Sequence, residues 1–124
     1  MTELKIVDSV ELLVSTIVDA IQELKGHQIT SLDLREIPHA VTDFFVVCHA
    51  TSNTQVEAIA RNVEVEVNQN HQERPWQKEG QTNAEWVLLD YGNVVVHVFY
   101  KDARDFYGLE ELWADAKVTH FEED

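Results

Sequence analysis

The chain has 124 residues, with 9 Lys and Arg against 23 Asp and Glu, and its formal net charge is −14 at pH 7. Its apolar share of 44% supplies one hydrophobic core, which excludes a disordered acidic tail and predicts a single domain over residues 1–124. The acidic excess disfavours binding to nucleic-acid backbones and to anionic membranes, and it favours a partner rich in Lys and Arg.

The cysteine content and the apolar runs predict a cytoplasmic protein. Cys48 is the only cysteine, so no internal disulfide forms and nothing indicates an oxidising compartment. The longest apolar runs, such as 44–48 and 94–96, are too short to span a bilayer. The first residues are acidic, which is untypical of targeting segments.

Two stretches carry apolar residues at helical spacing, and each has its own start signal. The first begins after Asp8, a capping residue, and ends at Gly26. The second begins after Ser52, which has capping-box spacing to Gln55. This second helix is expected to end before a polar loop over 69–75.

Five runs are predicted to form strands: 28–34, 44–48, 76–79, 85–89 and 94–100. The run 44–48 is apolar at every position, which is typical of a central strand covered on both faces. A tight turn separates the last two runs, so they are expected to pair as an antiparallel hairpin.

The sequence after the hairpin predicts two short helical segments and a solvated tail. Asp102 is expected to cap a helix through Phe106, Gly108 to break it, and 109–113 to form a last helical turn. Residues 116–124 are expected to form an acidic tail. The element order predicts an α/β fold, layered as α+β, with a mixed central sheet of about five strands flanked by helices.

The sequence lacks the local motifs of metal, phosphate and nucleophilic chemistry. No two of the six histidines lie three to five residues apart, and Cys48 has no partner, which disfavours a zinc site. No GxGxxG, GxxxxGKS/T or GxSxG motif is present. Residues 49–53 could hold an anion at a helix N-terminus, but a capped turn is the favoured interpretation. We expect no metal, no cofactor and no catalytic residue.

Two features allow more than one interpretation. Asp33 and Asp43 lie beside strands and could form a metal-binding pair for nucleotide chemistry, although strand alternation favours an outward Asp33 and an Asp43 that only starts a strand. Trp86 lies in the first arm of the hairpin and could belong to the core or to a binding surface with an acidic rim. His97, in the second arm, is expected to be partly buried and hydrogen-bonded.

Several segments together resemble the ribosomal silencing factor family, RsfS, also called the Iojap family. They are Glu79-Gly80 with AEWVLLDYGNVVVHVF at 84–99, LDL at 32–34, TDFFVV at 42–47, SNTQVEAIA at 52–60 and ARDFYGLEELWADA at 103–116. The resemblance covers roughly residues 8 to 116. The chain departs from it at 48–50, where many members carry a glycine, and at Gly108, where members carry a larger residue.

The resemblance implies a function that composition cannot show. Members bind ribosomal protein L-fourteen on the large ribosomal subunit, block joining of the small subunit and so repress translation. Their fold is nucleotidyltransferase-like, without the catalytic Gly-Ser and paired-Asp motifs, and members often form homodimers. The resemblance thus implies a non-enzymatic repressor without direct nucleic-acid readout.

Carried over from the family, the partner-binding residues of this chain are Trp86, Leu88, Asp90 and Glu79. Trp86 and Leu88 would supply an apolar anchor, while Glu79 and Asp90 would meet Lys or Arg on the partner. Two other functions stay open at this point. One is a nucleotidyltransferase-like enzyme that uses Asp33 or Asp43 with Mg²⁺, and the other is a homodimeric scaffold for another basic protein.

Overall fold

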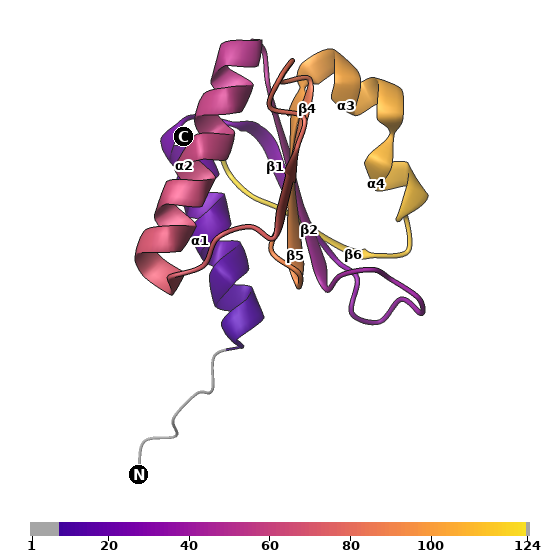
Figure 1. Cartoon of the computed structure of the whole chain (residues 1–124). Coiled ribbons are helices and arrows are strands. Elements are labelled where there is room, and N and C mark those ends of the chain that lie inside the picture. Colours follow the sequence, from indigo (N-terminus) through magenta and orange to yellow (C-terminus); the bar gives the residue numbers. More distant parts are fainter. Residues whose placement is uncertain (1–7, 124) are drawn as a thin grey trace.

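The computed structural model describes residues 8–123, in which four helices and six strands are formed (Figure 1). In chain order they are α1 (Ser9–Glu23), β1 (His27–Asp33), β2 (Phe44–Ala50), α2 (Asn53–His71), β3 (Gln77–Glu79), β4 (Trp86–Asp90), β5 (Val94–Tyr100), α3 (Lys101–Tyr107), α4 (Leu109–Leu112) and β6 (Lys117–His120). The predicted layered α/β architecture is confirmed.

The strands form one mixed sheet in the order β3-β4-β5-β2-β1-β6. Only β2 and β5 run parallel, and the other neighbours pair antiparallel. The predicted hairpin is confirmed, because Trp86 lies opposite Phe99 and Asp90 lies opposite Val95. The two edges of the sheet are therefore β3 and β6.

The helices divide between the two faces of the sheet (Figure 1). The long helices α1 and α2 pack against each other and cover one face, whereas α3 and α4 lie over part of the other face. In β5, Val94, Val96 and Val98 point to the α1/α2 side, and Val95 and Phe99 point to the α3/α4 side. This alternation gives the protein two hydrophobic cores separated by the sheet.

The apolar composition of β2 correctly predicted its central position in the sheet. All seven of its residues are buried, because β1 and β5 flank it and helices cover both of its faces. Burying an apolar side chain on either face stabilises the fold by about 1.5–3 kcal/mol for a Val or a Phe. The continuous apolar run is thus the signature of a strand without a solvated face.

The long helices begin where their capping residues predict. The Asp8 carboxylate accepts a hydrogen bond from the Val10 N–H at 2.9 Å, and the Ser52 hydroxyl accepts one from the Gln55 N–H at 3.1 Å. The expected cap at Asp102 is wrong, since α3 begins at Lys101 directly after β5 and has no side-chain cap. Gly108 ends α3 as predicted, with a left-handed φ of 57°.

The C-terminal stretch differs most from its prediction. Residues 117–120 were expected to belong to an acidic tail but form β6, which pairs antiparallel with β1, so the sheet has six strands and not about five. The carboxylate of Glu123 then accepts hydrogen bonds from the Gln28 N–H at 3.0 Å and from His27 Nδ1 at 2.8 Å. These bonds lower the pKa of the Glu123 carboxyl. β6 forms because the outer edge of β1, which lies much earlier in the sequence, offers unpaired backbone groups to this segment.

Candidate functional site

The structure brings the four predicted partner-binding residues together at one edge of the sheet. Trp86, Leu88 and Asp90 alternate along β4 and therefore share a face. Glu79 of the edge strand β3 lies directly opposite Leu88 and so joins the same face. This is the face partly covered by α3 and α4, and we call the edge formed by these four residues the β3–β4 edge.

Trp86 is half-buried and belongs to both the core and the surface. Its ring centroid lies 4.8 Å from that of Phe99 below and 4.8 Å from that of Tyr107 on α3. Its indole Nε1–H donates a hydrogen bond to His97 Nδ1 at 3.0 Å. The polar end of the indole is therefore satisfied internally, and the ring is held in one orientation.

His97 supports Trp86 from within the sheet, as the predicted hydrogen-bonded histidine. Only 3% of His97 is exposed, and burial lowers the pKa of its imidazole to about 3. The ring is therefore neutral at pH 7, with Nδ1 free to accept the Trp86 proton and Nε2 carrying the ring proton. Within residues 8–123 the buried Nε2 has no hydrogen-bond partner.

Asp90 and Glu79, the two acidic residues of the edge, differ in their contacts. The Asp90 carboxylate accepts a hydrogen bond from the Gly92 N–H at 2.7 Å, which fixes the turn between β4 and β5. Glu79 is exposed and forms no ion pair with any residue of 8–123. Glu79 thus keeps its charge available, whereas Asp90 contributes to the site while also holding the hairpin.

Sequence reasoning missed the aromatic residues that α3 adds to this site. Phe106 is 81% exposed and its ring centroid lies 5.1 Å from that of Tyr107, which in turn contacts Trp86. Trp86, Tyr107 and Phe106 therefore form a continuous aromatic row from β4 onto α3. The available signal was an aromatic pair that directly follows the acids of 102–105, but only the docking of α3 shows which way this pair faces.

A buried arginine fixes the position of α3. Arg104 is 7% exposed, and its guanidinium donates to the Gln28 carbonyl at 2.8 Å and to the Glu110 carboxylate at 2.8 Å. It also lies 3.0 Å from His49 Nδ1, and burial together with this cation lowers the pKa of His49. Arg104 thereby ties α3 to β1 and β2, and positions the aromatic row.

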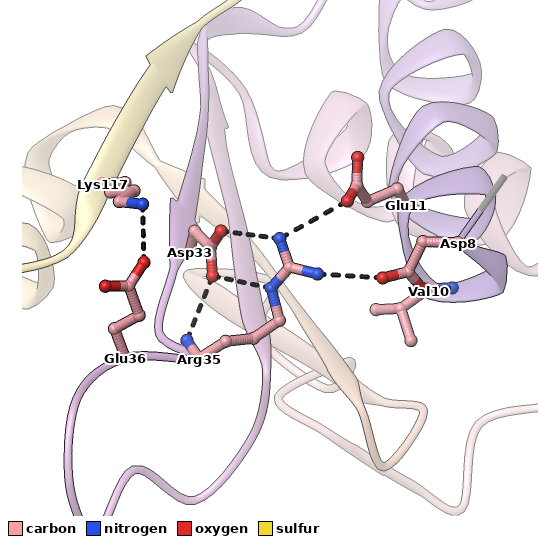
Figure 2. Close-up of polar contacts among 7 residues, drawn as sticks. All are labelled: Asp8, Val10, Glu11, Asp33, Arg35, Glu36 and Lys117. Atoms are coloured by element: carbon pink, nitrogen blue, oxygen red, sulfur yellow. Dashed lines mark hydrogen bonds and ion pairs between the residues drawn. The ribbon is translucent and has the colours of Figure 1, made fainter. Parts of the chain in front are cut away.

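The alternative of a metal site for nucleotide chemistry finds no support in the geometry. Asp33 is held by the Arg35 guanidinium at 3.0 and 2.9 Å, and these hydrogen bonds lower the pKa of its carboxyl. Figure 2 shows that Arg35 also reaches Asp8 and Glu11 on the side of α1. Asp33 and Asp43 line different hollows, and no group of three or more His, Cys, Asp or Glu among residues 8–123 could hold a metal ion.

The remaining candidates for chemistry are structural. Cys48 is fully buried, and burial raises the pKa of its thiol to about 12, so it is an inert core residue. Ser52 is the cap of α2, as the favoured interpretation of its loop predicted. In the described part of the chain, no helix has the length and apolar character that crossing a membrane requires.

Comparison with known proteins decides the family. A family model described as ribosomal silencing factor during starvation, RsfS, matches residues 7–124. The chain belongs to the ribosomal silencing factor family. The resemblance stated from the sequence motifs is thereby confirmed.

Relatives and a solved structure support this membership. Ribosomal silencing factor RsfS of Halalkalibacterium halodurans is 41% identical over 110 residues, which cover 89% of this chain and 92% of that protein. The protein of the same name from Bacillus subtilis is 42% identical over 100 residues, covering 81% and 83%. A crystal structure of a Chromobacterium violaceum protein superposes with a TM-score of 0.80 at 32% identity, covering 85% and 86%.

Membership indicates a regulatory protein of the ribosome. The names of these relatives describe the silencing of ribosomes, which is regulation of translation. The site described above suits such a role, because it offers an aromatic surface with the exposed Glu79 beside it.

Proposed function

We propose that this protein binds the large ribosomal subunit through ribosomal protein L-fourteen, blocks joining of the small subunit and so represses translation. The observation that carries the proposal is the aromatic row at the β3–β4 edge, on a chain that belongs to the ribosomal silencing factor family. The partner itself comes from the family resemblance of the sequence motifs.

The aromatic row has the properties of a binding anchor. Trp and Tyr are enriched among the residues that dominate interface energies. Trp86 is held in one orientation by its hydrogen bond to His97 before any partner arrives, and Tyr107 packs against it. Phe106 is 81% exposed, so a partner can remove most of its surface from water. A pre-ordered anchor loses little side-chain entropy on binding, and this favours affinity.

The charges around the row favour a basic partner. Glu79 on β3 is exposed, and Asp102 and Asp105 are exposed on α3, the helix that carries Tyr107 and Phe106. Such exposed charges raise the association rate toward a basic surface and set its orientation more than they add affinity. Ribosomal proteins that neutralise RNA present surfaces of this kind.

Silencing by occlusion needs no chemistry. A domain of 124 residues has a radius of gyration of about 14 Å, so its body is wider than the gap between two macromolecular surfaces in contact. A copy bound on the joining face of the large subunit therefore excludes the small subunit sterically. Steric exclusion of this kind requires no catalytic residue.

The proposal is tested by sedimentation with purified subunits. The wild-type protein should cofractionate with free large subunits on a sucrose gradient and lower the yield of joined ribosomes. Trp86→Ala should weaken binding by about 2–4 kcal/mol. Because Trp86 also packs on Phe99, the variant's circular dichroism and melting curve must show that it is folded. Wild-type protein that stays at the top of the gradient at low salt would contradict the proposal.

A further inference from the structure

A groove lined by cations lies on the face of the β3 edge opposite to the aromatic row. Its volume is about 550 Å³, and Arg61 and Asn68 of α2, Arg74 of the following loop and Lys78 of β3 line it. We call it the α2–β3 groove. Three of the nine Lys and Arg residues of the chain, Arg61, Arg74 and Lys78, therefore line this one groove.

Two of these cations are free for a ligand. Lys78 Nζ lies 3.2 Å from the Glu64 carboxylate, which is the single acid that lines the groove. Arg61 and Arg74 form no ion pair with any residue of 8–123. By contrast, the guanidinium groups of Arg35 and Arg104 are each held by carboxylates of the protein. The groove thus carries two uncommitted guanidinium groups on a chain of net charge −14.

The edge strand sorts its charges by face. Lys78 lies opposite Leu89, which is buried on the α2 side, whereas Glu79 lies opposite Leu88 on the α3 side. Neighbouring residues of β3 therefore present a cation to one side of the sheet and an anion to the other. A partner that docks on the α3 side, at Glu79, leaves the α2 side with Lys78 uncovered. The α2 side can then contact a molecule that neighbours this partner.

We propose that the α2–β3 groove binds backbone phosphates of ribosomal RNA beside the protein docking site. The inference rests on the proposed function, which places the β3 edge on a basic ribosomal protein embedded in RNA. Arginine matches this ligand, because its planar fork donates two parallel hydrogen bonds to phosphate oxygens. The contact is to backbone only and reads no base, so it positions the protein without sequence specificity.

The groove also resolves an electrostatic difficulty of the proposed function. A chain of net charge −14 is repelled by RNA, and exposed acids on α3 add to this repulsion on the side of the aromatic row. The two guanidinium groups of the groove offset this repulsion locally and favour approach of the RNA on the α2 side. The groove would therefore orient the protein as well as contribute affinity.

The test measures the salt dependence of binding to purified large subunits. The double variant Arg61→Gln with Arg74→Gln should lower the slope of log affinity against log KCl by about 1.4–1.8, as expected for two lost phosphate contacts. Lys78 is kept so that Glu64 stays paired. The matched control, Lys25→Gln with Lys117→Gln, removes the same charge outside the groove and should leave the slope unchanged.

Each alternative result has a defined meaning. An unchanged slope in the double variant, or an equal loss in the control, would overturn the proposal. The same loss of slope with isolated ribosomal protein L-fourteen would also overturn it, because the groove would then bind protein.

A second measurement separates this inference from the proposed function. If wild-type protein does not bind large subunits, the proposed function fails. Nuclear magnetic resonance then tests separately whether the groove binds RNA. A twelve-base-pair RNA duplex, titrated at low ionic strength, should shift the Nε–Hε signals of Arg61 and Arg74. The signals of Arg35 and Arg104, which the protein itself holds, should stay in place. No selective shift would overturn the proposal in that case.

Discussion

The two faces of the sheet are covered in different ways. Under α1 and α2 the core is almost entirely aliphatic, and its helices begin with side-chain caps. Under α3 and α4 the core is rich in aromatic rings, it contains the buried His97, and its covering helices are short. The first face is built for stability, whereas the second shares its rings between the core and an exposed surface.

This comparison predicts where stability and binding can be separated. On the aliphatic face a substitution should change the free energy of unfolding without changing affinity for a partner. On the aromatic face the two quantities are coupled at Trp86 and separate again at Phe106, which is 81% exposed.

The largest effect is expected on the aliphatic face. Ile59→Ala removes a fully buried side chain of α2 and should lower the free energy of unfolding by about 2–5 kcal/mol. Urea denaturation followed by circular dichroism measures this change. Binding of the folded variant to large subunits should equal that of wild type, and a loss of binding at a temperature where it stays folded would break the distinction between the faces.

The buried histidine should make the aromatic face sensitive to acid. Burial lowers the pKa of His97 to about 3, so below pH 6.5 the unfolded chain binds a proton that the folded protein excludes. The free energy of unfolding should then fall by about 1.4 kcal/mol per pH unit as the pH drops from 6.5 toward that value. Denaturant titrations at several pH values measure the slope.

A matched variant isolates the contribution of His97. His97→Gln keeps a hydrogen-bond acceptor for Trp86 but cannot take up a proton, so its stability should depend less steeply on pH below 6.5. The same slope in His97→Gln and in wild type would show that other groups, such as His49, carry the acid sensitivity.

The smallest effect on stability, and a clear one on binding, is expected at the exposed end of the aromatic row. Phe106→Ala should change the free energy of unfolding by less than about 0.5 kcal/mol. It should weaken binding to large subunits about tenfold, because the partner no longer buries this ring. Val41→Ala in the loop before β2, which also truncates an exposed apolar side chain and lies outside the α2–β3 groove, should change neither quantity. Equal affinities of the two variants would remove Phe106 from the site.

Local patterns predicted the elements whose signals lie within one segment. The capping residues Asp8 and Ser52 and the apolar run of β2 each depend on neighbours in sequence, and each was identified correctly. The placing of Trp86, Leu88 and Asp90 on one face followed from the two-residue period of a strand. The nucleotidyltransferase-like character of the fold stays a prediction.

The features that were missed depend on partners far away in the chain. All four residues of β6 are exposed, so no burial pattern marks it, and its pairing partner Thr30 lies 90 residues before His120. Phe106 and Tyr107 extend the aromatic row from Trp86 only because Arg104 fastens α3 across β1 and β2. Such tertiary placement is not encoded in local periodicity.

The pairing of the last strand with the first also has a kinetic consequence. Since β6 covers the outer edge of β1, the sheet can close only after residue 120 has been synthesised. Until then β1 presents unpaired backbone groups along that edge, which is a template for wrong pairing. Contacts of such large sequence separation are costly in loop entropy and slow to form. Completion of this edge of the sheet therefore has to wait until residues 117–120 have left the ribosome that made them.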